Sequence, residues 1–153
     1  LSKVRRGNNH IHFFFALTCR FKIEINNAVV PEAPPTAQVL TAYMQLHNNA
    51  DMPQTVVSIS SPQFERVEMH RTEIADGIAR MKPVEHIRIA AGESAELKEG
   101  GMHLMMYRPD TRYKAGDCVE LILHFADDST QSLRASVAKR KGMPDPVDHS
   151  HHH

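Results

Sequence analysis

The chain has 153 residues, with 18 basic and 18 acidic side chains, 11 histidines, 8 methionines and no tryptophan. This length suits one domain with one hydrophobic core, and a formal net charge of zero gives no electrostatic footprint for nucleic acid or an anionic membrane. No apolar run reaches the roughly 18 to 20 residues that a membrane-spanning helix needs.

Residues 1–20 differ from the rest of the chain. The basic stretch "KVRR" precedes the apolar "HIHFFFALTC", which is the order of an export signal. We expect an export-signal remnant or an N-terminal arm here, with a membrane anchor or a cloning remnant as further readings. The two cysteines, Cys19 and Cys118, form no CxxC pair, so the sequence predicts neither a zinc knuckle nor a thioredoxin-type site. "ALTC" faintly resembles a lipoprotein processing site, but its leucine is misplaced.

From residue 21 onward, short stretches alternate apolar and polar residues between turn signals such as "NNAD", "ADG", "KAGD" and "ADDS". The loop "PEAPP" cannot join a central strand, because proline lacks the N–H group. The pattern predicts strands over residues 21–30, 36–48, 55–61, 64–73, 78–84, 94–101, 103–108, 118–125 and 130–139. Eight or nine short strands without a long amphipathic helix predict a β-sandwich or Greek-key barrel over residues 21–140. Residues 141–153 have no apolar period and are expected to form a flexible tail containing Met and His.

The segment "GGMHLMMYRP" combines imidazole and thioether. On a strand His103 and Met105 lie on one face, and Met102, Leu104 and Met106 lie on the other. A turn at residues 76–77 would bring His70 and Met81 together as near-opposite neighbours on paired strands. One such pair alone is usually core packing. Two imidazoles and two thioethers together can form a metal site, with His103 partly exposed.

The donor types limit which metal fits. Ca²⁺ and Mg²⁺ prefer oxygen ligands, and structural Zn²⁺ prefers thiolate, imidazole or carboxylate. Cu(I) is soft and accepts methionine and histidine. Other residues of these types lack a partner at ligand spacing. We expect His47, His86 and His124 to be surface or hydrogen-bonded residues and Met44 to be packed. Met69 is expected to be a core residue or a secondary contact, and Cys118 a small buried hydrophobe.

The set His70, Met81, His103 and Met105 resembles, in residue type and spacing, the H-x10-M-x21-H-x-M signature of the periplasmic PCuAC copper chaperones. The similarity covers roughly residues 21–138 and includes "TAYMQLHN", "MKPVEHIRIAAGE" and "YKAGDCVELILHFADD". The resemblance implies an all-β, cupredoxin-like Greek-key sandwich or barrel that binds Cu(I) at these four residues outside the cytoplasm. It also implies a non-enzymatic role in cytochrome c oxidase assembly. Copper would pass toward the CuA centre, to subunit II of the oxidase or to a thiol-bearing copper chaperone.

Several alternatives stay open. The tail residues His149, His151, His152 and His153 are a candidate second site for Cu(II) as well as Cu(I), although a purification-tag remnant is another reading. A β-sandwich interaction module and a general periplasmic copper-storage or resistance protein remain rival functions. A blue-copper carrier is disfavoured, because Cys118, His124 and Met143 are spaced too openly for its ligand loop. No hydrolase motif is visible. We expect a monomer that binds neither nucleic acid nor a small-molecule substrate.

Overall fold

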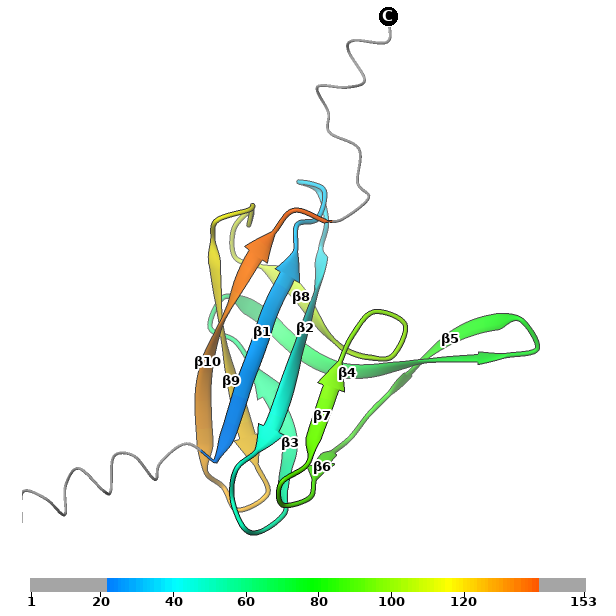
Figure 1. Ribbon diagram of the computed structural model, residues 1–153. Helices are drawn as coiled ribbons and strands as arrows, with labels where there is room; N and C mark the ends of the chain where they lie inside the picture. Colours follow the sequence, from blue (N-terminus) through cyan, green and yellow to red (C-terminus); the bar gives the residue numbers. More distant parts are fainter. Residues whose placement is uncertain (1–21, 141–153) are drawn as a thin grey trace, which may run out of the picture.

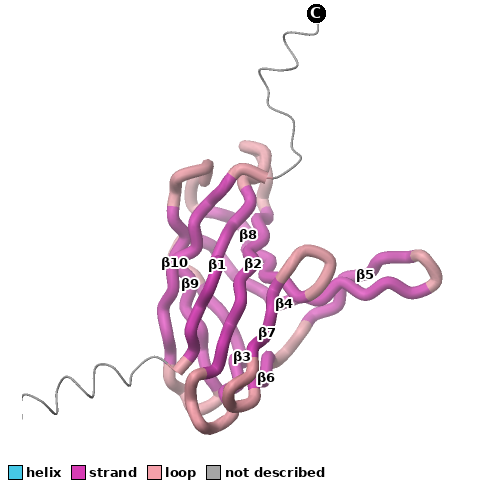
Figure 2. Tube along the Cα trace, viewed as in Figure 1, coloured by secondary structure: helices cyan, strands magenta, loops and turns pink. Residues whose placement is uncertain are grey.

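The computed structural model describes residues 22–140 (Figure 1). The predicted N-terminal arm and the predicted tail, including its histidines, therefore lie outside the described residues. Within 22–140 the chain forms ten strands and no helix, which confirms the all-β prediction (Figure 2). The strands are β1 (Ile23–Pro31), β2 (Val39–Asn48), β3 (Gln54–Ser60), β4 (Phe64–Ala75), β5 (Ile78–Pro83), β6 (Ile87–Ile89), β7 (Ser94–Leu97), β8 (Met102–Pro109), β9 (Cys118–Phe125) and β10 (Thr130–Ala138). In this part of the chain no helix is long and apolar enough to cross a membrane.

All ten strands belong to one hydrogen-bonded sheet in the order β5-β4-β8-β7-β2-β1-β10-β9-β3-β6, and β8 also pairs directly with β2. Figure 1 shows the sheet folded into two layers, with β10, β1 and β2 in front of β9, β3 and β8. Strands β1 and β10 run parallel, whereas the pairs β4–β5 and β4–β8 that concern the candidate site are antiparallel. The two layers enclose one core, as a sandwich or barrel requires.

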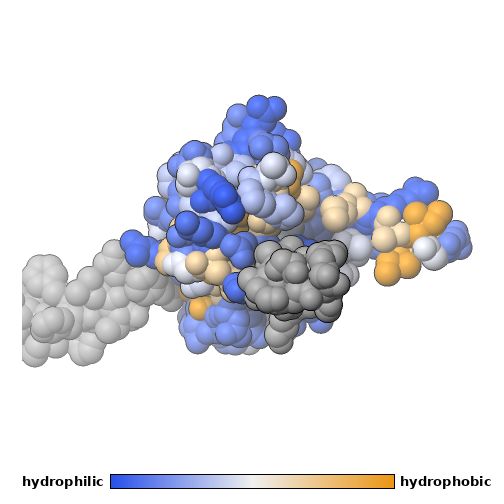
Figure 3. Space-filling view, turned by 90° about the horizontal axis from the view of Figure 1, so that it is seen from above, coloured by the Kyte–Doolittle hydropathy of each residue, from blue (hydrophilic) through white to orange (hydrophobic). Residues whose placement is uncertain are grey.

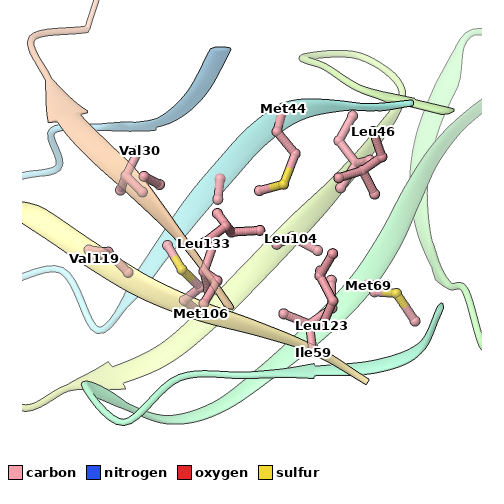
Figure 4. Packing of buried hydrophobic residues seen from close by; sticks show 14 of the residues in the cluster. Val30, Met44, Leu46, Ile59, Met69, Leu104, Met106, Val119, Leu123 and Leu133 are labelled. Carbon is pink, nitrogen blue, oxygen red and sulfur yellow. The ribbon is translucent and has the colours of Figure 1, made fainter. Parts of the chain in front are cut away.

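The core follows from alternation along the strands. In β9, Val119, Leu121, Leu123 and Phe125 all point inward and are buried, as their spacing predicts. Figure 4 shows side chains from β2, β3, β4, β8, β9 and β10 meeting in this core, and the predicted packing of Met44 and Met69 is confirmed. The prediction that Cys118 is buried is wrong. Cys118 is exposed, because it precedes Val119 on the strand and therefore lies on its outward face.

Strand β6 was not predicted, because three residues carry too little periodicity. It pairs with β3 and is also bonded by Asn48, a fully buried polar residue at the end of β2. The side-chain amide of Asn48 donates to the carbonyls of Ile89 (2.9 Å) and Met52 (2.8 Å), and its Oδ1 accepts from the Ala50 N–H (2.8 Å). Buried polar groups are tolerated when bonded in this way. Asn48 thus links β2 to β6 and to the following turn.

Strands β4 and β5 extend beyond the sandwich as a projecting hairpin, seen clearly in Figures 1 and 2. We call residues 71–83 the arm and the remaining described residues the body. The arm reverses at Asp76 (φ 55°) and Gly77 (φ 76°), flanked by the pair Ala75–Ile78. Positive φ at both central residues is the geometry of a type I′ two-residue turn, which Asp-Gly favours. Every residue of β5 is exposed.

Candidate metal centre

Strand pairing places the four predicted ligands on one face of β5, β4 and β8. His70 lies directly opposite His103 in the β4–β8 ladder. Met105 follows two residues after His103 and therefore shares its face. In the β4–β5 ladder Met81 lies opposite Thr72, which shares the face of His70. The sequence prediction of a common face is confirmed in this register.

His70 and Met81 are near-opposite neighbours, as predicted, but in a diagonal arrangement. Met81 is not the direct partner of His70, because Pro83 holds that position. The two-residue turn instead pairs Met81 with Thr72, two residues beyond His70, so Met81 is the diagonal neighbour of His70. Diagonal neighbours on one face remain within reach of a long, flexible side chain such as methionine.

The two imidazoles form the buried part of the site. Their ring centroids are 6.2 Å apart and the rings are tilted by 31°. His70 is largely buried, and only 4% of His103 is exposed, so the expectation of a partly exposed His103 is wrong. His103 is buried because β8 is an interior strand here: its neighbour Met102 pairs with β4 on one side and with β7 on the other.

Hydrogen bonds fix which nitrogen of each ring carries hydrogen. His103 Nδ1 lies 3.0 Å from the Gly101 carbonyl oxygen, and His70 Nε2 lies 2.9 Å from Glu68 Oε1. A carbonyl and a carboxylate only accept, so these two ring nitrogens must donate. In the neutral rings the other nitrogens, Nδ1 of His70 and Nε2 of His103, are then bare. Both bare nitrogens are buried and have no hydrogen-bond partner among the described residues.

The thioethers differ in their surroundings. Met105 is half-buried on β8, whereas Met81 is 57% exposed on the arm. Figure 3 shows the arm projecting from the body with hydrophobic residues exposed on it. Met102 and Met106 contact the core on the opposite face of β8, which agrees with their predicted direction. A metal held by both thioethers would therefore connect the arm to the body.

Glu68 is a site residue that sequence reasoning missed. Its carboxylate accepts from His70 Nε2 and, through Oε2, from Arg66 Nε at 2.8 Å. The hydrogen bond from His70, followed by that from Arg66, lowers the pKa of Glu68 to about 2, so it is ionised at neutral pH. The available signal was its position two residues before His70, on the same face of β4.

The donor set determines what this face can bind. No group of three or more His, Cys, Asp or Glu residues forms a possible metal site within residues 22–140. The face instead offers two bare imidazole nitrogens and two thioethers, and each ring donates the N–H of its other nitrogen to an oxygen, as metal-binding histidines usually do. Neutral nitrogen and soft sulfur donors suit Cu(I) better than hard or thiolate-preferring cations.

The remaining histidines have other surroundings. His47 bonds to Ser94 (2.7 Å) and His124 to Ser60 (2.8 Å), and His86 is exposed. These observations confirm the predicted surface or hydrogen-bonded roles. His149, His151, His152 and His153 lie outside the described residues, so the tail site stays a prediction.

Comparison with known sequences identifies related proteins. The model of a family described as "Putative lipoprotein LpqE-like" matches residues 23–137. An uncharacterised protein of Rickettsia prowazekii is 30% identical over 117 residues, which cover 72% of this chain and 65% of that protein. A putative lipoprotein of Leifsonia xyli is 26% identical over 102 residues, covering 66% of this chain and 61% of its own. The chain thus spans slightly less than two thirds of the length of these relatives.

Solved structures share the fold. A copper-bound PCuAC domain from PmoF2 superposes with a TM-score of 0.64 at 20% identity, covering 78% of this chain and 95% of that domain. The protein DR1885 of Deinococcus radiodurans matches in its apo form (27% identity, TM-score 0.63, 82% and 85% coverage). It also matches in its Cu(I) form (29% identity, TM-score 0.61, 76% and 78% coverage). The fold is therefore the cupredoxin-like fold of PCuAC domains, and the resemblance predicted from residue spacing is confirmed.

Proposed function

We propose that this chain, a member of the LpqE-like family of putative lipoproteins, is a copper carrier. It binds one Cu(I) and passes it to an accepting protein. The proposed ligands are His70, Met81, His103 and Met105. The observation that carries the proposal is the pair of buried, bare imidazole nitrogens on the face shared with both thioethers. The copper-bound and Cu(I) states named for the structural relatives support it.

The arrangement suits carriage by ligand exchange. All four donors are neutral, and thioethers are weak donors, so Cu(I) can be passed to thiolate or imidazole ligands without a change of oxidation state. His70 and His103 are fixed in the body, whereas Met81 stands exposed on the arm. An accepting protein can therefore reach the metal from the side of Met81. No bond of a substrate is made or broken, so the proposed role is not enzymatic.

An anaerobic titration with Cu(I) against a competing chelator tests the site. The background is the full chain with Cys19→Ser and Cys118→Ser, because Cys118 is an exposed free cysteine and a thiolate can bind Cu(I) on its own. One tight equivalent is expected. Combining Met81→Leu with Met105→Leu removes two ligands. Cu(I) affinity should therefore fall by more than the roughly 100-fold that is lost when a residue that only supports a ligand is removed.

Met102→Leu is the matched control, because Met102 directly precedes the proposed ligand His103 on β8 but packs against the core on the other face. It should leave Cu(I) affinity unchanged. Methionine and leucine have similar volumes, so each variant should lose less than about 1.5 kcal/mol of stability. Affinity that survives the double substitution, or that falls equally with Met102→Leu, contradicts the ligand assignment.

The acceptor and the location are further parts of the proposal. We assign donation to CuA assembly of cytochrome c oxidase, through subunit II or a thiol-bearing chaperone, by a carrier that acts as a monomer. Lipoprotein names in the family and in the Leifsonia relative favour an extracytoplasmic, membrane-anchored protein. Copper transfer from the loaded protein to a purified CuA domain distinguishes a donor from a storage or resistance protein, which would retain its copper.

The tail site is a separate proposal. Its four histidines suit Cu(II) because they offer imidazole without thioether. Deleting residues 143–153 is expected to remove one Cu(II) equivalent and to leave the Cu(I) equivalent of the core. Unchanged Cu(II) stoichiometry would argue against a tail site.

A further inference from the structure

A line of polar side chains runs along β4 toward the candidate site. The guanidinium of Arg66 lies over the ring of Tyr107, 4.1 Å from its centroid, and these two residues are direct partners in the β4–β8 ladder. Arg66 Nε donates to Glu68 Oε2 at 2.8 Å. Glu68 Oε1 in turn accepts from His70 Nε2 at 2.9 Å. Each contact limits the freedom of the next side chain, so the last of them fixes the His70 ring.

The two imidazoles of the site are held by different kinds of group. His103 donates to the main-chain carbonyl of Gly101, which no side-chain substitution removes. His70 donates to a side-chain carboxylate, and Glu68 itself is 40% exposed while His70 is only 15% exposed. The orientation of His70 therefore depends on one replaceable residue, although the ring is mostly shielded from water.

We propose that Glu68 is a positioning residue of the copper site, whose carboxylate holds His70 in the tautomer and orientation that present Nδ1 to the metal. This inference rests on the proposed function. Without an acceptor at Nε2, a neutral imidazole can place its hydrogen on either nitrogen. The form with hydrogen on Nδ1 has no lone pair facing the site and cannot bind there. Part of the protein would then have to change tautomer before it binds copper.

The first readout uses the metal-free protein. Long-range ¹H–¹⁵N correlation spectra distinguish protonated from bare ring nitrogens, and His70 is assigned by comparison with His70→Gln. Wild-type His70 is expected in the Nε2–H form. Glu68→Ala should shift it toward a mixture of tautomers, while His103 keeps its Nδ1–H form. Glu68→Gln should retain the Nε2–H form, because the amide oxygen can still accept.

The second readout is Cu(I) affinity in the cysteine-free background. Loss of the partner of a metal-binding histidine typically costs 10- to 100-fold in metal affinity, so Glu68→Ala should weaken Cu(I) by about that factor. Glu68→Gln should recover most of the loss. Glu73→Ala is the matched control, since Glu73 is an exposed carboxylate on the same strand. It pairs with Lys82 (3.1 Å), and both side chains lie on the face of the arm opposite to the site. It should change neither readout.

The outcomes separate this inference from the proposed function. Wild-type protein that binds no Cu(I) overturns the proposed function and this inference with it. Wild-type protein that binds Cu(I), together with a Glu68→Ala variant that keeps both the His70 tautomer and the affinity, overturns the inference alone. A fall in affinity without any change in tautomer would also overturn it, because the loss would then come from charge and not from positioning.

Discussion

The body and the arm share strand β4 but are stabilised differently. In the body, Phe64 and Met69 are buried in the core, whereas further along the same strand Ile74 is 73% exposed on the arm. Both parts form regular antiparallel pairs, yet only the body has a second layer of sheet to cover its apolar face (Figure 1). A two-stranded hairpin without such cover is at best marginally stable. The proposed site lies across this boundary, with both imidazoles in the body and Met81 on the arm.

The largest expected effect on stability comes from the body. Leu104 on β8 is fully buried, so Leu104→Ala removes packed methyl groups and leaves a cavity. The free energy of unfolding should fall by about 2–5 kcal/mol in urea denaturation. Ile74→Ala is the control on the arm and should change stability by no more than about 0.5 kcal/mol. Similar losses from both substitutions would mean that the arm is packed as tightly as the body.

Copper loading should reduce the difference between the two regions. Metal-free protein is expected to exchange the backbone amides of β5 faster than those of β8, because an exposed hairpin opens locally at little cost. If Met81 binds Cu(I), opening of the arm must break the bond between Met81 and the metal. At a free Cu(I) concentration about 100 times the dissociation constant, exchange in β5 should slow by up to about 100-fold (~2.7 kcal/mol).

Hydrogen-exchange mass spectrometry of apo and loaded protein measures this change. Met81→Leu is the control, because it removes the thioether and should abolish the protection of β5. Equal protection in wild type and Met81→Leu would show that the arm is not tied to the body through this residue.

A smaller effect is expected from a polar group of the body. Asn48→Ala deletes the donors to the buried Ile89 carbonyl and to Met52, so it should cost about 1–3 kcal/mol in the same denaturation assay. Asn49→Ala is the neighbouring control, since the Asn49 side chain is exposed and makes one long hydrogen bond to Glu24 (3.3 Å). It should change stability by no more than about 0.5 kcal/mol. Equal effects of the two substitutions would contradict the role of Asn48 as a buried link.

Much of the local structure could be predicted from the sequence because it depends on neighbours in the chain. Alternation identified the inward face of β9, and Asp76-Gly77 identified the reversal of the arm. The same alternation separated His103 from Met102 on β8. The outward direction of Cys118 follows from the same alternation, because Cys118 directly precedes the inward-facing Val119.

Other features could not be predicted because they depend on which distant strands become neighbours. The burial of His103 follows from the position of β8 between β4 and β7. The acceptor role of Glu68 depends on the ring of His70 turning toward it and on Arg66 holding its other oxygen. Strand β6 depends on its ladder with β3 and is bonded by Asn48, and both partners lie far from it in the sequence.

The sequence by itself determined the chemistry of the proposed site and the face on which each donor lies, because residue type and the two-residue period of a strand are local properties. It did not determine that His70 would lie opposite His103 or that Met81 would stand on an uncovered arm. Nor did it determine that two imidazole nitrogens would be buried without a hydrogen-bond partner within residues 22–140. Those features were decided by strand order and by the extent of the second layer. Both arise from long-range packing, which sums small contributions from the whole chain and leaves no short pattern in the sequence.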